Sequence, residues 1–398
     1  MISAEEAKNI ILGAVDQLPV EQKPLLDALR HVLAEDIVAE ENVSPFDNSA
    51  MDGFAVRSDD FRTVPVVLDV VGEVAAGHVT TRHIDKGQAI RVMTGGKIPQ
   101  GADAVVQIEW TEPIDGQHVK VLQSVPLGHN VRRAGEDIRA GEKVLEKGRE
   151  IRAAELGVLA SLGRTTVSIY RKPKVAILAT GDELVEISAA ITEGKIRNSN
   201  SYALHALCAE AGALPVMLGI EKDEKEKVRA KIQQGLKHDV LITSGGVSVG
   251  KYDIVREVLL ELGVEIKFWK VSIKPGMPLL FGLYDEKLVF GLPGNPVSTM
   301  VTFLMFVRPA LWKLMGKAQL EPGVKLCARL DHDLKKSDKK RHFVRGVLEQ
   351  RNGTYVVRAT GSQTSNVLTS MVKANCFIIV SEEQCDLQAG EAVEVELL

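Results

Sequence analysis

The sequence predicts a multidomain protein of the α/β class with additional β-rich domains. Three short apolar runs, at residues 175–179, 240–242 and 288–290, each end in a polar, glycine-bearing loop that is followed by a helical pattern. Short runs that are apolar throughout indicate buried strands of a parallel sheet, which has helices on both faces. The β-rich patterns of residues 64–145 and 324–398 predict separate domains made of short strands.

The loops that follow these three strands predict a ligand site. In open α/β sheets, ligands bind outside the carboxyl ends of the strands. The loops at residues 180–183, 243–250 and 291–296 contain mostly small residues. Backbone N–H groups in such loops open onto helix N-termini, an arrangement that binds phosphate or another oxyanion. We therefore expect a phosphate or oxyanion site at this edge of the sheet.

Length and composition exclude several classes of protein. A chain of 398 residues is too long for one ordinary core, so two to four domains are expected. A net charge of −4 and an aromatic content of 5% argue against a nucleic-acid-binding protein. The sequence has no apolar run of membrane-spanning length and no secretion signal. We expect a cytoplasmic protein that contacts neither a membrane nor nucleic acid.

The N-terminal part of the chain mixes helices with a β-rich segment. Ser3 and Glu6 form a capping box, which predicts an N-terminal helix. A second helical segment is expected near residues 25–33. The short β runs of residues 64–145 then predict a small β domain, and residues 153–163 return to a helical pattern.

The C-terminal part begins with the α/β domain. Residues 171–174 form a polar hinge into it, and residues 270–278 predict a further strand that ends in a Pro/Gly turn. No helix is expected after Leu314. Residues 321–323 are typical of a linker, and the module that follows is expected to be all β, with a hairpin turn at residues 351–354.

Two carboxylates directly follow the first buried strand. Asp182 and Glu183 should therefore lie at the ligand edge of the sheet. Carboxylates repel an anionic ligand unless a cation lies between them, so we expect Mg²⁺ held by one or two carboxylates and by substrate phosphate oxygens. The other loop acids, taken singly, are better explained as capping or solvated residues: Asp52, Asp137, Asp223 and Asp253.

Basic residues offer candidate anion contacts. Lys270 and Lys274 are four apart on an extended segment, so in one strand both would point to the same face and form a cationic pocket suited to phosphates. Solvation at the surface explains them equally well. Arg132 and Arg133 could form a second anion contact or belong to an ordinary exposed loop. The basic run at residues 335–345 is expected to be a solvated face.

Nothing in the sequence indicates covalent or zinc chemistry. Ser244 and Ser248 lie in a glycine-rich loop without a histidine nearby in the sequence. The sequence contains no Cys-x-x-Cys, no His-Glu-x-x-His, no dinucleotide fingerprint and no Walker loop. The cysteines are expected to be buried or incidental. The residues alone thus predict a phosphate or oxyanion site with a divalent cation, and they leave the substrate open.

Five motifs in the same order along nearly the whole chain resemble those of molybdopterin molybdenumtransferase, the MoeA family, which is related to the C-terminal part of gephyrin. Each motif alone is weakly specific, but their ordered combination makes coincidence very unlikely. They lie at residues 49–55, 91–96, 180–184, 244–250 and 291–296.

This resemblance implies the last step of molybdenum cofactor synthesis. Adenylylated molybdopterin and molybdate would be the substrates, a divalent cation such as Mg²⁺ would be required, and AMP would be released. The resemblance also implies an elongated homodimer whose active cleft lies between the α/β domain of one subunit and the small β domain of the other. A MogA-type adenylyltransferase and molybdoenzyme apoproteins are the further partners it suggests.

Four domains per chain follow from the same resemblance. Residues 1–45 and 138–172 would form a discontinuous, extended N-terminal domain, and residues 46–137 a small β-rich domain inserted in it. Residues 173–320 would form the MogA-like α/β domain that binds molybdopterin, with a mainly parallel sheet. Residues 321–398 would form a C-terminal β domain resembling a barrel.

The motifs carry site residues over to this chain. The residues expected to be catalytic are Asp52, Thr94, Asp137, Glu183, Asp223 and Asp253, and the cation would bind Asp182 and Glu183. The substrate-binding residues would be Thr180, Gly181, Asp182, Ser244, Gly245, Gly246, Ser248, Lys270, Lys274, Pro293, Gly294, Asn295, Arg345 and Ser365.

One position departs from the family pattern. Many relatives have a further lysine where this chain has Met277, so we hypothesise that Lys270 and Lys274 suffice for the anion. Two alternative functions stay open. The chain could be a molybdopterin adenylyltransferase of the MogA type, although residues 247–250 differ from the Thr-Gly that usually follows the Gly-Gly pair there. It could also be a non-catalytic cofactor-binding scaffold, as part of the role of gephyrin suggests.

Overall fold

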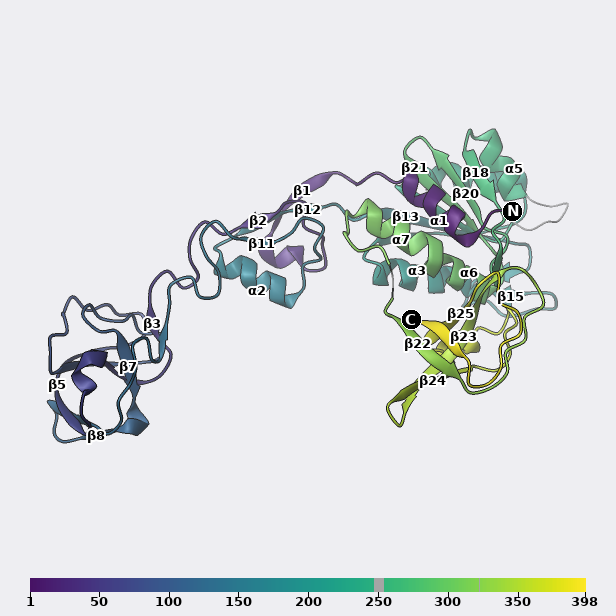
Figure 1. The fold of residues 1–398 in the computed structure, drawn as a ribbon. Helices are drawn as coiled ribbons and strands as arrows, with labels where there is room; N and C mark the ends of the chain where they lie inside the picture. The colour runs from purple at the N-terminus through teal and green to yellow at the C-terminus, as the bar shows by residue number, and fades with distance from the viewer. Residues whose placement is uncertain (247–253, 322) are drawn as a thin grey trace. The chain divides into compact units, whose positions relative to one another are not determined.

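The computed structural model describes residues 1–246, 254–321 and 323–398. The chain forms two compact units, which are described one at a time (Figure 1). The first consists of Met1–Ala34, Gly148–Arg152 and Val167–Leu398, and the second of Glu35–Lys147 and Ala153–Thr166.

A six-stranded sheet is the centre of the first unit. Its strand order is β16-β13-β17-β21-β20-β18. The strands β16, β13, β17 and β21 are parallel, as predicted for the three apolar runs, whereas β20 and β18 continue the sheet antiparallel. The bounds are β13 Lys174–Thr180, β16 Leu214–Glu221, β17 Val240–Ser244, β18 Glu265–Trp269, β20 Leu280–Tyr284 and β21 Lys287–Leu292.

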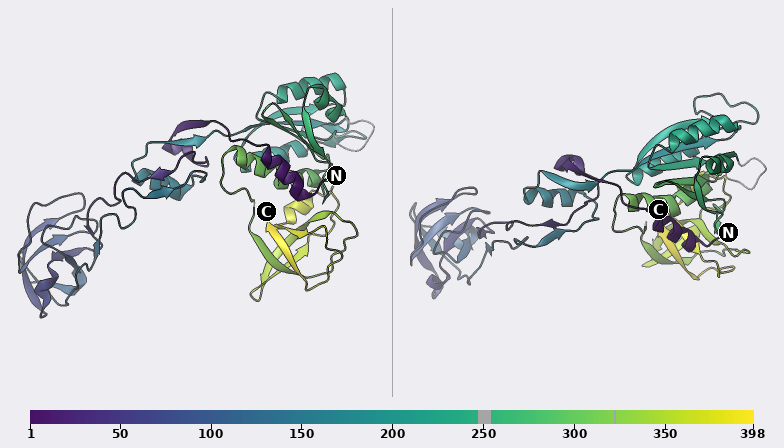
Figure 2. Two further views of the ribbon diagram at one scale, coloured as in Figure 1. Left: turned by 45° about the horizontal axis from the view of Figure 1, so that its top comes forward. Right: turned by 90° about the horizontal axis from the view of Figure 1, so that it is seen from above.

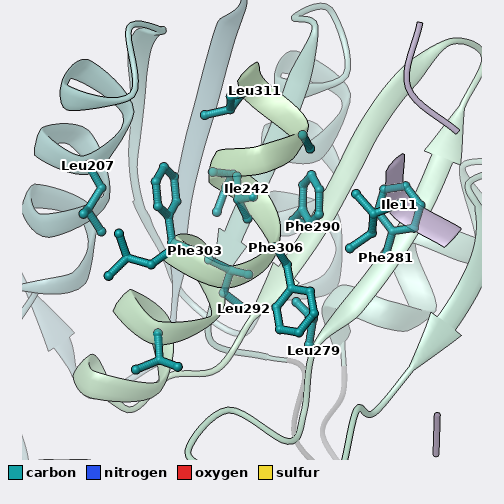
Figure 3. Close-up of a cluster of buried hydrophobic side chains, with 14 of the residues drawn as sticks. Ile11, Leu207, Ile242, Leu279, Phe281, Phe290, Leu292, Phe303, Phe306 and Leu311 are labelled. Atoms are coloured by element: carbon teal, nitrogen blue, oxygen red, sulfur yellow. The ribbon is translucent and has the colours of Figure 1, made fainter. Parts of the chain in front are cut away.

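Helices cover both faces of this sheet because successive strand residues point to opposite sides. On β13, Ile177 packs into one core together with residues of α1, α3, α6 and α7, and its neighbour Leu178 packs into a second core with α4 and α5. Figure 3 shows the first core, in which Ile242, Phe290 and Phe303 come together. The helices are α1 Ala4–Gly13, α3 Asn200–Glu210, α4 Lys225–Gly235, α5 Ile254–Glu261, α6 Pro296–Thr302 and α7 Arg308–Leu314.

Two helical features follow from the local sequence. The Ser3 hydroxyl accepts a hydrogen bond from the Glu6 amide at the start of α1, which confirms the predicted cap. A π-helical turn, η4 (Phe303–Val307), joins α6 to α7. The resulting stretch Pro296–Leu314 is apolar and long enough for a membrane span, but 78% of it is buried inside the protein. It therefore behaves as a core helix.

The prediction of a helix near residues 25–33 is mostly wrong. A 3-10 turn, η1 (Leu25–Ala28), ends where Arg30 adopts a positive φ of 62°. Val32 and Leu33 then form β-bridges with Glu150 and Ile169, which bury their apolar side chains better than one turn of helix would. In the same region β1 (Val20–Pro24) pairs with β12 (Thr166–Tyr170), and β14 (Leu184–Val185) pairs with β15 (Ile196–Arg197) further along the chain.

A closed β-barrel completes the first unit. The long strand β23 pairs with both β24 and β25, and β22 and β26 close the ring between them. Asn352 and Gly353 form the predicted hairpin turn between β23 and β24, with positive φ at both residues. The strands are β22 Lys325–Leu330, β23 Arg341–Arg351, β24 Thr354–Ala359, β25 Cys376–Val380 and β26 Ala392–Leu397.

Two elements of this barrel were not predicted. A short helix, α8 (Thr369–Lys373), lies beyond Leu314, where no helix was expected. The barrel also gains a parallel strand, β19 (Ile273–Lys274), from the chain between β18 and β20 of the central sheet. The C-terminal barrel is therefore hydrogen-bonded to a segment of the α/β domain.

The second unit is built mainly from short strands (Figure 2). Buried side chains of its sheet form two clusters. Its six-stranded sheet has the order β7-β4-β6-β5-β9-β8, and two short strand pairs, β2 with β11 and β3 with β10, accompany it. The predicted helix at residues 153–163 is α2 (Ala153–Ser161), and the turns η2 (Ser58–Phe61) and η3 (Ile108–Trp110) are 3-10 helical. The strands are β2 Ile37–Val38, β3 Asn48–Ser49, β4 Gly53–Val56, β5 Val66–Val74, β6 Gln88–Val92, β7 Ala104–Gln107, β8 Thr111–Pro113, β9 His118–Val121, β10 Val131–Arg132 and β11 Lys143–Leu145.

Candidate functional site

The loops after β13, β17 and β21 meet at the carboxyl edge of the central sheet. Their strands end in register, because Ser244 pairs with Ala179 on one side and with Leu292 on the other. The loop backbones approach closely: a Cβ on Gly245 would lie 2.4 Å from the Thr180 carbonyl oxygen. Only glycine fits there, since the φ of Gly245 is also 94°. The predicted convergence of these loops is present.

Asn200 joins two of the loops, although no sequence pattern predicted this role. Its side-chain amide donates to the Ser244 hydroxyl at 2.9 Å and to the Gly294 carbonyl at 2.7 Å. The Thr299 hydroxyl donates to the Pro293 carbonyl at 2.6 Å and fixes the β21 loop to α6. These bonds hold the ends of β17 and β21 in fixed positions. Asn200 lies at the start of α3, far from both loops in sequence, so no local pattern marks it.

One hydroxyl at the site is buried and unused. Thr180 is 2% exposed, and its Oγ1 has no hydrogen-bond partner among the described residues. A Cβ on Gly246 would lie 3.0 Å from this oxygen, so the glycine loop passes directly over it. A buried hydroxyl costs free energy unless it is hydrogen-bonded. The Thr180 hydroxyl is thus a donor suited to a bound oxyanion.

Acidic side chains gather beside the glycine loops. The Asp223 amide donates to Asp182 Oδ1 at 3.3 Å, and the Glu183 carboxylate folds back against Gly181, where a Cβ would lie 2.6 Å from Oε2. Burial, followed by the charges of Asp182 and Glu183, raises the pKa of Asp223. Lys195 donates to the backbone carbonyl of Asp182 at 2.5 Å and forms no ion pair with a carboxylate among the described residues. The three carboxylates therefore share an excess of negative charge.

This charge excess fits a cation, although the protein alone does not complete a cage. Within the described ranges, no group of three His, Cys, Asp or Glu residues is placed to hold a metal ion. Mg²⁺ commonly keeps several waters and takes only one or two carboxylates together with substrate phosphates. Asp182 and Glu183 match such a partial ligand set. Asp253 and Ser248, two further predicted site residues, lie outside the described residues.

The expected strand carrying Lys270 and Lys274 on one face is wrong. Strand β18 ends at Trp269, and Lys270 has a φ of 82°, which breaks the extended conformation. The Lys270 ammonium lies over the Trp269 ring, 4.1 Å from its centroid. Lys274 belongs instead to β19, and its ammonium lies 3.6 Å from Asp338 Oδ2. The two lysines thus have different surroundings.

The segment after Lys274 packs against α6. A Cβ on Gly276 would lie 2.6 Å from the Thr302 methyl group, so the turn is held tightly against the helix. At Met277, where the resemblance led us to expect a missing cation, the Lys340 ammonium lies 3.6 Å from the sulfur. A lysine from the barrel therefore occupies the neighbourhood of Met277.

The barrel contributes two predicted residues, one of which is buried. The Ser365 carbonyl accepts a hydrogen bond from the Val297 amide at 3.1 Å, which brings it to the loop of Pro293, Gly294 and Asn295. Arg345 is only 1% exposed, and burial lowers its pKa to about 10. Its guanidinium donates to the Ser370 hydroxyl and the Thr364 carbonyl, each at 3.2 Å. Arg345 thus positions the loop that contains Ser365.

The basic run at residues 335–345 was expected to be a solvated face, but part of it is buried. Lys336 is 5% exposed and donates to the carbonyl oxygens of Gln384 at 2.7 Å and Glu382 at 3.3 Å. Strand β23 begins within the run, and its residues 342–346 are all buried. Pairing of this strand inside the barrel, which local charge does not reveal, buries part of the run.

Asp52 and Thr94 form a hydrogen-bonded pair in the second unit. Asp52 Oδ1 accepts from both the amide and the hydroxyl of Thr94, each at 2.7 Å. These two hydrogen bonds lower the pKa of Asp52, the hydroxyl having the larger effect. Asp137 lies in a hollow of about 320 Å³ that is also lined by Arg132, Arg133 and Asn48. The four sequence-predicted charged residues of this unit are exposed, namely Asp52, Arg132, Arg133 and Asp137.

Comparison with known proteins decides the family. A molybdopterin molybdenumtransferase from Haemophilus influenzae is 37% identical over the whole chain and 98% of its own length. One from Bacillus subtilis is 36% identical over the whole chain and 94% of its length. The chain belongs to the MoeA family.

Domain matches and a solved structure agree with this membership. The MoeA N-terminal region (domain I and II) matches residues 2–163, a molybdopterin-binding domain matches residues 176–313, and the MoeA C-terminal region (domain IV) matches residues 327–398. The crystal structure of a MoeA protein from Pyrococcus horikoshii has a TM-score of 0.85 at 32% identity and covers 100% of both chains. The predicted fold class and family of this MoeA-family chain are thereby confirmed. Its four-domain boundaries remain a prediction.

Proposed function

We propose that the chain is a molybdopterin molybdenumtransferase that inserts molybdenum from molybdate into adenylylated molybdopterin and releases AMP. Relatives of this name match the chain along its entire length. The converging loops of β13, β17 and β21 bring the Thr180 hydroxyl, which has no partner among the described residues, to the edge of the sheet as a donor for a phosphate-bearing ligand. Both substrates are anions, so a site that binds them must neutralise and orient charge.

The gathered carboxylates of Asp182, Glu183 and Asp223 are the observation that carries this proposal. Burial, followed by the charges of Asp182 and Glu183, raises the pKa of Asp223 beside this loop edge. Mg²⁺ on Asp182 and Glu183 would remove this repulsion and polarise the phosphoanhydride, the role of metals in phosphoryl chemistry. No protein nucleophile is required, which agrees with the absence of a Ser–His or Cys–His arrangement from the sequence motifs.

The proposal includes a homodimer in which the partner subunit supplies Asp52, Thr94 and Asp137 to the cleft. Two features support it. Asp52 is held ionised by Thr94, and Asp137 lines a hollow with two arginines, so both belong to accessible polar sites. We place the reaction in the cytoplasm, with a MogA-type adenylyltransferase supplying the substrate and molybdoenzyme apoproteins receiving the product.

AMP release tests the proposal. The protein is incubated with adenylylated molybdopterin and Mg²⁺, with and without molybdate, and AMP is quantified. We expect AMP release that depends on molybdate and is lost when EDTA removes the cation. Release at the same rate without molybdate would contradict the proposal, and so would the formation of adenylylated molybdopterin from ATP and molybdopterin, which defines an adenylyltransferase. No release under any condition would leave a cofactor-binding scaffold as the function.

The dimer is tested by mixing two inactive variants. Asp52→Ala and Glu183→Gln subunits are inactive by themselves in this proposal. Mixed dimers would contain one intact cleft, so we expect AMP release to recover to about one quarter of the wild-type rate, because half of the dimers are mixed and each has one of two sites. Absence of any recovery after verified subunit exchange would place both residues in the same subunit's site.

A further inference from the structure

A second charged cavity lies in the first compact unit, among residues to which no function has been assigned. Its volume is about 480 Å³. The C-terminal ends of α3 and α7 form part of its wall, with Ala209–Gly212 and Met315. Its charged lining consists of Arg30, Glu150, Lys172, Glu210 and Lys317. None of the predicted site residues lines this cavity.

Two of the three cations in the lining share the single negative charge of Glu150. Arg30 Nη1 lies 2.9 Å from Glu150 Oε1, and Lys317 Nζ lies 2.7 Å from Oε2. Both carboxylate oxygens are therefore used, and the pKa of Glu150 is lowered by Lys317 and Arg30 in spite of its burial. The carboxylate has no free oxygen for a further cation.

Lys172 is the cation that remains. It is half-buried, lines the cavity, and its ammonium forms no hydrogen bond or ion pair within the described part of the chain. Burial and the neighbouring charge of Lys23 lower its pKa. The pKa of His31 is lowered by burial and by the charges of Lys172 and Lys23. Glu21 pairs with Lys23 at 3.5 Å and offsets part of its charge, and Glu150 does the same for Lys172. Because Glu210 also lines the cavity, its three cations and two anions leave a net charge of +1.

We propose that this cavity binds a phosphate group, with the Lys172 ammonium as its charge partner and Arg30 and Lys317 at its edge. A tetrahedral dianion accepts hydrogen bonds from several directions and suits lysine and arginine donors. The volume exceeds that of inorganic phosphate, so a phosphate ester also fits. The negative ends of the α3 and α7 dipoles offset part of the positive charge, and a modest affinity follows. This inference does not depend on the proposed function.

Binding is measured by isothermal titration of the full chain with inorganic phosphate, against potassium chloride at matched ionic strength. Lys172→Met keeps the length of the side chain and removes its charge. We expect it to weaken phosphate binding by about tenfold or more, because a hydrogen bond to a charged group is lost. Lys174→Met is the matched control: Lys174 is exposed, two residues further on and outside the cavity lining, so its replacement should leave binding unchanged.

The outcomes separate this cavity from the strand-end loops. Phosphate bound only at those loops would bind wild type and Lys172→Met equally, and that result would overturn the proposal. Absence of binding to the wild type would overturn it as well. Ribose 5-phosphate distinguishes the two sources of the group, because tighter binding than inorganic phosphate identifies an ester and equal binding identifies the free ion.

His31 provides a measurement on the unmodified protein. Bound phosphate would offset the charge of Lys172, whereas Lys23 and Glu21, which also act on His31, lie outside the cavity lining and would be unaffected. The pKa of His31 should therefore rise toward its ordinary value. Imidazole resonances followed by NMR against pH, with and without phosphate, report this change. An unchanged His31 titration at saturating phosphate would contradict the proposal even if Lys172→Met failed to fold.

Discussion

Asp52 and Asp223 are aspartates whose surroundings shift their pKa values in opposite directions. Asp52, in the small β unit, receives two hydrogen bonds from Thr94, which lower its pKa. Asp223, at the edge of the α/β sheet, is half-buried beside Asp182 and Glu183, which raise its pKa. The first carboxylate is stabilised as an anion by the protein alone. The second belongs to a group whose charge the protein leaves uncompensated.

These opposite pKa shifts suit two different roles at a site for anionic substrates. A carboxylate that is ionised and oriented can accept a proton or a hydrogen bond at a defined position. A cluster of mutually repelling carboxylates instead favours the binding of a cation, because Mg²⁺ relieves the repulsion when it binds. The sites differ in their surroundings rather than in their residue type.

Removing the carboxylate cluster should have the largest effect. The double substitution Asp182→Asn and Glu183→Gln is expected to lower molybdate-dependent AMP release by roughly a hundredfold or more, because cation binding stabilises the transition state by several kcal/mol. Glu186→Gln, an exposed acid in the same loop, is the control and should retain the wild-type rate. Full activity of the double variant would assign the cation elsewhere.

The Asp52–Thr94 pair should have a smaller effect that depends on pH. Thr94→Val removes the hydroxyl donor, so the pKa of Asp52 rises toward its ordinary value and Asp52 becomes protonated at higher pH. The acid limb of the AMP-release profile is expected to move to higher pH, with a loss of roughly tenfold in rate. Thr94→Ser keeps the hydroxyl and should restore the profile. Equal profiles for both variants would disprove a role for this hydrogen bond.

Loss of the hydrogen bonds that Asn200 makes to the loops after β17 and β21 should lower the stability of the protein. Asn200→Ala removes the amide that joins Ser244 to Gly294, so the free energy of unfolding in urea should fall by about 1 kcal/mol. Asn295→Ala is the control, because the Asn295 side chain makes no capping hydrogen bond at the start of α6. Equal losses for the two variants would show that Asn200 is not a specific connector.

Asp223→Asn should have the smallest effect, and it should stabilise. The pKa of Asp223 is raised in the folded protein, so the ionised form opposes folding, and stability falls as pH rises through the folded pKa. At pH 7 the variant should gain on the order of 0.5 kcal/mol after screening by solvent, and the gain should shrink as the pH falls below the folded pKa of Asp223 and when Mg²⁺ is added. Asp239→Asn should do the opposite, since Arg171 pairs with Asp239 and lowers its pKa. A loss of stability in Asp223→Asn would contradict the proposed repulsion.

The buried strands of the α/β domain and the loops at the carboxyl edge of its sheet were predictable from local sequence. The runs at residues 175–179, 240–242 and 288–290 are apolar on both faces, and only a sheet covered on both sides buries all of them. Gly245 was predictable for a related reason, because a loop that passes over a neighbouring strand has no space for a side chain. Capping by Ser3 and the turn at Asn352 and Gly353 likewise depend on adjacent residues.

The remaining features depend on residues that are distant in sequence. Lys274 leaves the α/β sheet because β23 offers it a partner strand, and nothing near residue 274 reveals that strand. Lys336 and Arg345 are charged, so local pattern places them at the surface, yet barrel closure buries them. Asn200 was missed because its hydrogen-bond partners belong to two other loops. The predicted roles of the site residues await the experiments above.

Because β19 pairs with β23, the barrel is not an independent module that evolution or protein engineering can move from one protein to another by itself. Ile273 is 1% exposed, and Gly276 is pressed against α6, so the interdomain ladder is part of two interiors at once. A chain cut after residue 320 would lose the partner of β19 and uncover its edge, which invites self-association. Exchange of barrels between relatives would succeed only if residues 270–278 were exchanged together with them.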